Sequence, residues 1–166
     1  MKRGQQILIL IVIVQWTLLN RAFSQTHWET AIYAEDTWHY FVGTTAPPAN
    51  WKNLDFDENN WSSGPGGFGY SDGDDNTTIP NTLAVFFRKS FQVDDLDAIL
   101  SAAVHSDYDD GFVAYLNGVE ITRSFNMGTS GSVVSYDQTT DSDHEAVMYQ
   151  GGLPDVFIFT SLMWLF

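Results

Sequence analysis

The stretch "SDYDDGFVAYLNGVEITR", residues 106–123, decides the fold class of this chain. Two runs rich in apolar residues flank Asn117-Gly118, and Asn-Gly is the dipeptide that best suits the tight turn of a two-residue hairpin. The pairing predicted from that turn is Leu116 with Val119, Ala114 with Ile121, and Phe112 with Arg123. It puts Glu120 on the solvent face, since a one-residue slip would move this carboxylate into the core. The stretch therefore predicts an antiparallel β-hairpin.

Short β-prone runs continue on both sides of this hairpin, and none of them has helical periodicity over a useful length. Clusters of Gly, Pro, Asn and Asp separate the runs, as in all-β sandwiches and barrels. A long irregular region spans residues 44–81. The candidate strands are residues 30–34, 38–43, 83–93, 101–107, 131–136, 145–149 and 156–159. We therefore expect an all-β fold, an antiparallel β-sandwich.

The N-terminus has the features of a secretory signal peptide. Two basic residues precede an unbroken apolar run from Ile7 to Val14, and residues 22–24 (Ala-Phe-Ser) offer small residues where a signal peptidase reads them. The alternative is a membrane anchor, but a spanning helix needs about 20 apolar residues and this run is shorter. We expect residues 1–24 to be removed, which leaves residues 25–166 as a single domain that is secreted or on the surface of a bacterial cell.

Charge and cysteine content narrow the possible partners of the expected domain. All 21 acidic residues but only four of the seven basic residues follow residue 24, so residues 25–166 carry a formal charge of −17. Such a surface repels phosphate backbones, which argues against nucleic acid as a partner, and it attracts divalent cations such as extracellular calcium. The chain has no cysteine, which excludes a disulfide scaffold and a thiol nucleophile.

Three carboxylates, those of Asp107, Asp109 and Asp110, come directly before the hairpin. They are the first candidates for a metal site, with calcium as the ion, because calcium prefers oxygen ligands. The alternative is structural, since Asp bonds the backbone two residues on and Gly111 tolerates positive φ, so an Asp-Asp-Gly corner satisfies its own turn. Turn chemistry explains the Asp-Asp pair but not Asp107, which keeps calcium as a hypothesis.

A second acidic cluster places Asp72, Asp74 and Asn76 at alternate positions, as oxygen-rich calcium loops do. It is no EF-hand, because the sixth position is Thr77 rather than glycine and the twelfth is Leu83 rather than glutamate. These three oxygen-bearing residues form the second-choice metal site. A solvated acidic loop is the alternative.

Three aromatic residues of the irregular region, Trp51, Trp61 and Tyr70, are candidates for ligand binding. Exposed rings at these positions could stack on the faces of sugars. Tryptophans in a β domain of this size more often pack in the core or beneath loops, so packing is the favoured interpretation.

No arrangement of residues in the sequence predicts catalysis. His105, Ser106 and Asp107 are adjacent, but adjacent side chains of a strand point to opposite faces and cannot form a relay. The chain lacks the Gly-x-Ser-x-Gly, His-Glu-x-x-His and phosphate-loop motifs. A catalytic pair of carboxylates needs one desolvated acid in a cleft, and the Asp-Asp pair has the sequence context of an exposed turn. We expect a protein that is not an enzyme.

Segments from most of the chain together carry a family resemblance. They are Trp51, "FDENNW" (56–61), "GPGGFGYSDGD" (64–74), "VFFRKSFQV" (85–93), "DYDDGFVAYLNGVEITR" (107–123) and "DHEAVMYQGGLPD" (143–155). Their order resembles the galactose-binding-domain-like jelly-roll module of secreted bacterial multidomain proteins, where it occurs beside CotH-kinase-like, lamin-tail or phosphoesterase domains. The resemblance covers about residues 38–158, and its most specific segment runs from Asp-Asp-Gly to Asn-Gly.

The resemblance implies a jelly-roll sandwich with a non-catalytic accessory role, in which a glycan or another cell-surface polymer is the usual partner. Such modules end in a further strand, whereas residues 159–166 here are a short apolar tail that cannot span a membrane. We therefore expect a fragment of a longer protein, short of its last strand, whose other domains are its partners. The protective-antigen-like sugar-binding barrel is the alternative fold. The functional alternative is a structural or adhesion spacer N-terminal to a catalytic domain, with no small ligand.

Overall fold

The computed structural model describes residues 26–70, 73 and 75–159 of the 166-residue chain. The chain divides into two compact units, residues 1–30 and 31–166, and the strands described here all belong to the second. The expected signal peptide, its cleavage site and the apolar tail after residue 159 lie outside the described residues. No helix in the described part of the chain is long and apolar enough to cross a membrane.

The largest sheet has three antiparallel strands in the order β2-β1-β5. They are β1 (Thr37–Val42), β2 (Ser62–Pro65) and β5 (Val85–Arg88). The central strand is β1, where Tyr40 lies opposite Ser62 of β2 and Phe87 of β5. A short parallel pair, β3 (Phe68–Gly69) and β4 (Thr77–Thr78), forms inside the irregular region.

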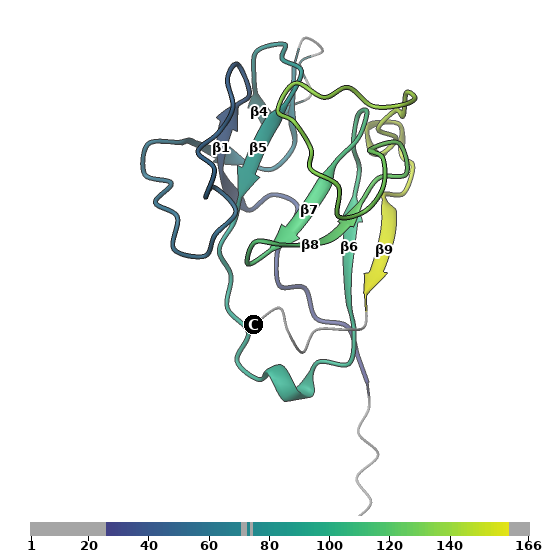
Figure 1. Cartoon of the computed structure of the whole chain (residues 1–166). Coiled ribbons are helices and arrows are strands. Elements are labelled where there is room, and N and C mark those ends of the chain that lie inside the picture. The colour runs from purple at the N-terminus through teal and green to yellow at the C-terminus, as the bar shows by residue number, and fades with distance from the viewer. Residues whose placement is uncertain (1–25, 71–72, 74, 160–166) are drawn as a thin grey trace, which may run out of the picture. The chain divides into compact units, whose positions relative to one another are not determined.

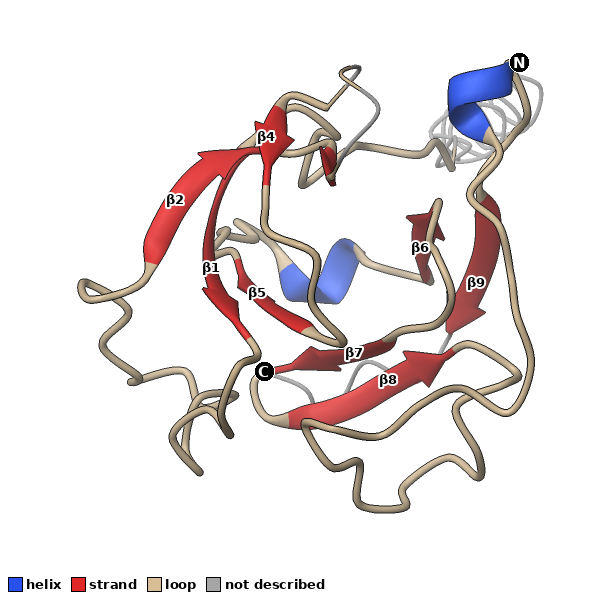
Figure 2. Cartoon of the chain, turned by 90° about the horizontal axis from the view of Figure 1, so that it is seen from above, coloured by secondary structure: helices blue, strands red, loops and turns tan. Residues whose placement is uncertain are grey.

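Two further antiparallel pairs complete the described strands, β6 (Ala102–Ser106) with β9 (Asp155–Phe159), and β7 (Val113–Leu116) with β8 (Val119–Arg123). Two short 3₁₀ helices, η1 (Leu96–Ala98) and η2 (Met148–Gln150), are the helical elements in this part of the chain. Within the second unit, the three-stranded sheet lies on one side, β6 and β9 on the other, and the β7–β8 hairpin between them (Figures 1 and 2). The strands confirm an all-β fold with mainly antiparallel sheets, and the jelly-roll sandwich stays a prediction.

Two of the expected strands are irregular segments instead. Residues 30–34 bend because the Asp36 carboxylate accepts the N–H of Tyr33 at 3.2 Å, and the main-chain oxygen of Tyr33 accepts the N–H of Asp36 at the same distance. Residues 131–136 are irregular and begin at a glycine with positive φ. They leave Val133 94% exposed, so this β-branched side chain has no sheet to pack against.

The prediction of a third strand, at residues 145–149, is also wrong, because a carboxylate binds main-chain N–H groups of this segment. The carboxylate of Asp107 accepts the N–H groups of Val147 and Met148, and the chain turns into η2. A strand would need these N–H groups for its ladder.

The β7–β8 hairpin forms as predicted at its turn but not along its whole length. Asn117 and Gly118 both have positive φ, 50° and 86°, and Leu116 lies opposite Val119. Further from the turn, a β-bulge shifts the pairing of the two strands by one residue. The pairs past the bulge are Ala114 with Thr122 and Val113 with Arg123, in place of the predicted Ala114 with Ile121 and Phe112 with Arg123. The predicted solvent position of Glu120 is also wrong, since its side chain is only 10% exposed.

Aromatic rings join the hairpin to the strands on either side of it. The ring centroid of Trp51 lies 5.2 Å from that of Phe86 in β5 and 5.9 Å from that of Tyr115 in β7, both edge to face. Phe112, just before β7, meets Phe157 of β9 at 5.1 Å. Such pairs stabilise a fold by about 0.5–1.5 kcal/mol each beyond the area that they bury.

Candidate functional site

The aspartate corner, residues 107–110, connects β6 to the hairpin and lies against the segment 141–148. The carboxylate of Asp107 accepts the N–H groups of Val147 at 2.8 Å and Met148 at 3.0 Å. The first N–H groups of a helical turn lack partners within the turn, and a carboxylate satisfies them. Asp107, which turn chemistry left unexplained, therefore fixes η2 about 40 residues further along the chain.

Asp110 holds the same segment at the other end of the corner. Its Oδ1 accepts the N–H of His144 at 3.0 Å, and its main-chain oxygen accepts Nδ2 of Asn126, also at 3.0 Å. The same Nδ2 donates to the main-chain oxygen of Ser142 at 2.5 Å. Asn126 thus connects the corner to the segment that covers it.

The amide of Asn126 is almost fully buried and only half satisfied. The residue is 2% exposed, and its Oδ1 has no hydrogen-bond partner among the described residues. Because Nδ2 points at two carbonyl oxygens, which can only accept, the orientation of the amide is fixed. A buried acceptor without a donor costs about 1–3 kcal/mol, so this oxygen is the atom of the corner that most needs a cation or a donor.

A stacked pair of rings, Tyr108 and His144, fills the inside of the corner. The rings are nearly parallel, at 10°, with centroids 4.0 Å apart. His144 Nδ1 lies 3.0 Å from the main-chain oxygen of Tyr108, so this nitrogen carries a proton. The hydroxyl of Tyr108 donates to Oδ2 of Asp155 at 3.0 Å, which ties the corner to the start of β9. Burial first, and the Asp155 carboxylate second, raise the pKa of Tyr108.

Asp109 is the exposed acid of the corner. Partial burial is the largest cause that raises its pKa, followed by the negative charges of Asp110 and Glu145 and a hydrogen bond with Asp110, while His144 lowers it. A carboxylate whose ionisation is disfavoured by negative neighbours favours a nearby cation or hydrogen-bond donor.

The geometry of the aspartate corner differs from that of the predicted metal site. Among the described residues, no three His, Cys, Asp or Glu side chains are placed to hold one metal ion. The carboxylates of Asp107 and Asp110 accept main-chain N–H groups, so the set Asp107, Asp109 and Asp110 does not converge as a cage. Oδ1 of Asn126, a residue bound through Nδ2 to the main chain of Asp110, is a further oxygen near this corner without a partner in the described structure.

Of the second-choice metal site, Asp72 and Asp74 lie outside the described residues. Asn76 is described, and its Nδ2 donates to the main-chain oxygen of Gly66 at 2.8 Å. This hydrogen bond holds the loop beside β3, so Asn76 has a structural role.

Two of the three predicted stacking residues, Trp51 and Trp61, are half-buried and pack on each other with ring centroids 6.3 Å apart. Trp61 also meets Phe41 and Phe56, each at 5.5 Å. These contacts agree with the packing interpretation. Tyr70 is 46% exposed and is the one of the three whose ring faces solvent.

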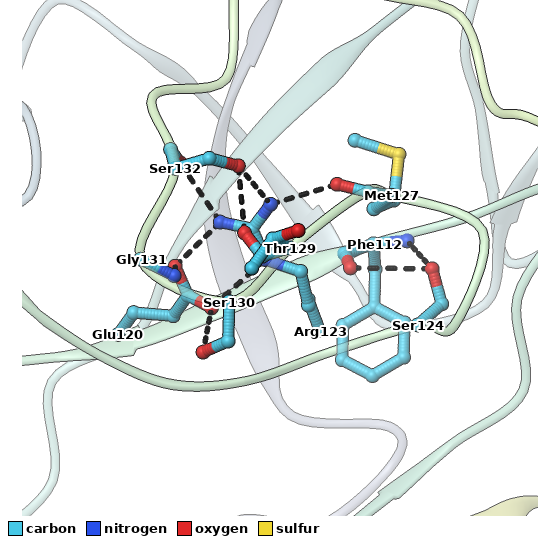
Figure 3. A network of polar contacts seen from close by, with 9 residues as sticks. All are labelled: Phe112, Glu120, Arg123, Ser124, Met127, Thr129, Ser130, Gly131 and Ser132. Atoms are coloured by element: carbon cyan, nitrogen blue, oxygen red, sulfur yellow. Dashed lines mark hydrogen bonds and ion pairs between the residues drawn. The ribbon is translucent and has the colours of Figure 1, made fainter.

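An ion pair that the sequence did not reveal lies within β8 of the hairpin, between Glu120 and Arg123 (Figure 3). Nε and Nη2 of Arg123 donate to Oε1 and Oε2 of Glu120 at 2.8 and 2.6 Å. Arg123 is 8% exposed and also donates to the main-chain oxygens of Met127, at 2.7 Å, and Ser132, at 2.9 Å. We call this set of contacts the Arg123 network. It closes the loop 127–132 onto β8.

The Arg123 network keeps Glu120 ionised. Hydrogen bonds from Arg123 are the largest cause that lowers the pKa of Glu120 to about 2, opposed by burial and helped by Ser130 and the N–H of Gly131. The hydroxyl of Ser130 lies 2.9 Å from Oε1, and the N–H of Gly131 lies 3.1 Å from Oε2. A buried charge with this many partners is tolerated, which explains how Glu120 can be inside.

Two residues shortly after the end of β8, Phe125 and Asn126, were missed by reasoning from the sequence. No motif marks them. Asn126 reaches Asp110 and Ser142, each 16 residues away, and such long-range contacts leave no local pattern. Phe125 is 73% exposed although it follows a strand, where an apolar residue is expected to pack.

No known protein family, curated protein or solved structure matches this chain.

Proposed function

We propose that this chain is an exported, non-catalytic module that binds carbohydrate or a cell-surface polymer at the aspartate corner, with calcium as a structural ion. The observation that carries the proposal is Oδ1 of Asn126, a buried oxygen without a hydrogen-bond partner in the described structure, in a corner rich in carboxylates. A cation would satisfy this oxygen. It would also relieve the repulsion from Asp110 and Glu145, which adds to the larger effect of burial in raising the pKa of Asp109.

The ligand chemistry supports calcium over other ions. Carboxylate and amide oxygens are hard ligands, and calcium accepts about 6–8 of them in flexible geometry, waters included. Asp109, Asp110 and Asn126 would supply protein oxygens and leave the remaining positions to water or a ligand. The formal charge of −17 over residues 25–166 favours the binding of any divalent cation.

Sugar hydroxyls suit the same corner because they donate to carboxylates and can coordinate calcium. The exposed side chains of Asp109 and Glu145 offer such acceptors. Glycoside hydrolysis would need a second acid that stays protonated in a dry cleft. Because Asp107 and Asp110 accept main-chain N–H groups instead, binding is favoured over hydrolysis.

A second candidate function is a structural or adhesion spacer. The contacts of Asp107 with η2 and of Asp110 with His144 favour it, because they give both acids a role in folding. In that case neither calcium nor a sugar would bind.

Calcium-dependent sugar binding tests the proposal. Isothermal titration of the purified full chain with calcium, then with soluble oligosaccharides of glucose, galactose, mannose and N-acetylglucosamine, is expected to show both events, and a chelator is expected to abolish the second. Asp109→Asn should weaken both. Asp94→Asn removes the same charge from an exposed position near η1 and should change neither. A folded chain that binds neither calcium nor any oligosaccharide would favour the spacer.

A further inference from the structure

Phe125 stands out because its side chain is exposed although its neighbours in the sequence are buried. Its neighbours Ser124, Asn126 and Met127 are 0%, 2% and 8% exposed, whereas Phe125 is 73% exposed. Burying a phenylalanine side chain normally stabilises a fold, so an exposed ring in such a segment forgoes that gain. We propose that Phe125 is the stacking platform of the aspartate corner and binds the apolar face of a sugar ring.

The backbone on both sides of Phe125 is held firmly in place. Oγ of Ser124 accepts the N–H of Phe112 at 3.0 Å, a contact drawn in Figure 3. On the other side, Asn126 is fixed by its two bonds to main-chain oxygens, and Met127 accepts from Arg123. The ring of Phe125 is therefore carried by a segment that would lose little conformational entropy when a ligand binds. Preorganisation of this kind lowers the entropic cost of binding.

The surroundings of Phe125 combine an apolar face with hydrogen-bond acceptors. Its ring centroid lies 6.4 Å from that of His144, whose main-chain N–H is held by Asp110. His144 also interacts electrostatically with Asp109, beside which lies the charge of Glu145. A ring and a set of carboxylates therefore flank the same histidine.

This combination selects a class of ligand. A pyranose ring has an apolar face of C–H groups and a rim of hydroxyl donors, so it can stack on Phe125 while its hydroxyls meet the carboxylates. The excess of acidic residues disfavours anionic sugars and nucleic acids. The ligand is accordingly a neutral or amino sugar. This inference rests on the proposed function, because it names the ring on which the bound sugar stacks.

The test compares variants of the full chain in the oligosaccharide titration. Phe125→Ala is expected to reduce the affinity for the best-binding oligosaccharide by roughly tenfold or more, because a stacked anchor is lost. Phe125→Tyr retains a ring and should stay within about threefold of the unaltered chain. The matched control is Tyr33→Ala, which removes an exposed ring from the segment before β1 and should leave the affinity unchanged. Melting curves of all variants report whether the fold is kept.

The outcomes separate this inference from the proposed function. If the chain binds an oligosaccharide and Phe125→Ala binds it equally well, the platform is refuted and the proposed function stands. If the folded chain binds none of the oligosaccharides, both are refuted. Oligolysine is a further probe, and binding of oligolysine but of no sugar, lost in Phe125→Ala, would overturn the sugar assignment in favour of a surface for basic peptides.

Discussion

Two arginines, Arg123 and Arg88, each hold a loop against a strand, and they do so by different means. Arg123 pairs with a carboxylate three residues away and is 8% exposed. Arg88 reaches Glu58, 30 residues earlier in the chain, at 3.3 Å, and donates to the main-chain oxygens of Trp51 and Asn53. One loop is closed by a neighbour in sequence, the other by a distant partner.

The loops differ in how many kinds of contact support them. The loop held by Arg88 also carries aromatic packing, since the guanidinium lies 5.1 Å from the ring centroid of Phe56 and Trp51 stacks on Trp61. The loop held by Arg123 depends mainly on the ion pair and its hydrogen bonds. A loop with redundant supports should tolerate the loss of one charge better than a loop whose single network is electrostatic.

The largest expected effect follows from breaking the Arg123 network. Glu120→Ala leaves the guanidinium of Arg123 buried without its carboxylate, and loss of one partner of such a pair typically costs about 3–5 kcal/mol. Chemical denaturation should show this loss as a lower midpoint. The double variant with Arg123→Met removes both charges and should regain part of the stability. Loss of less than about 1 kcal/mol in Glu120→Ala would show that solvent reaches the pair.

Acid should weaken the same network without any substitution. The pKa of Glu120 in the folded protein, about 2, lies below its ordinary value of 4.5. Its contribution to stability is therefore complete above about pH 4.5 and is lost as the pH falls through about 2. The difference in unfolding free energy between the unaltered chain and Glu120→Gln should shrink over this window. A difference that is constant with pH would contradict the lowered pKa.

A smaller effect is expected at Arg88. Arg88→Lys keeps the charge but loses the planar fork that reaches Glu58 and two main-chain oxygens, so unfolding should become easier by about 1–2 kcal/mol. Denaturation followed by tryptophan fluorescence would report the loop directly through Trp51 and Trp61. If Arg88→Lys lowered the free energy of unfolding as much as Glu120→Ala does, the two loops would not differ in their dependence on one charged contact.

The smallest effect is expected at Tyr108. Tyr108→Phe keeps the stack on His144 and removes the hydrogen bond to Asp155, so the expected loss is about 1 kcal/mol. The same denaturation experiment measures it, with Tyr70→Phe as a control in which an exposed ring loses its hydroxyl. An unchanged midpoint in Tyr108→Phe would mean that the aspartate corner is not tied to β9 by this bond.

The sequence predicted the parts of the fold that local patterns encode. The Asn117-Gly118 turn and the all-β class are correct, because positive φ and short β-prone runs have residue signatures. The register beyond the bulge was not predictable, since alternation of residue types predicts an unbroken ladder and a bulge inserts one extra residue into it.

The candidate site was predicted less well than the fold. The sequence pointed to the three aspartates but could not show that Asp107 satisfies N–H groups 40 residues away. It gave no sign of Asn126 or Phe125, whose importance comes from burial and exposure in the folded chain. Contacts between residues so far apart in the sequence are set by tertiary packing, so local sequence patterns do not predict them.

Thermal unfolding of the full chain with millimolar calcium, and again with a chelator, tests most directly the proposal that the aspartate corner binds calcium. Because a bound ligand stabilises the folded state, Tm should rise by several degrees with calcium and fall back with the chelator. In Asp109→Asn the two curves should nearly coincide, whereas Asp94→Asn should behave like the unaltered chain. Cooperative unfolding at the same Tm in both conditions would contradict a calcium site and leave the aspartates as supports of the fold.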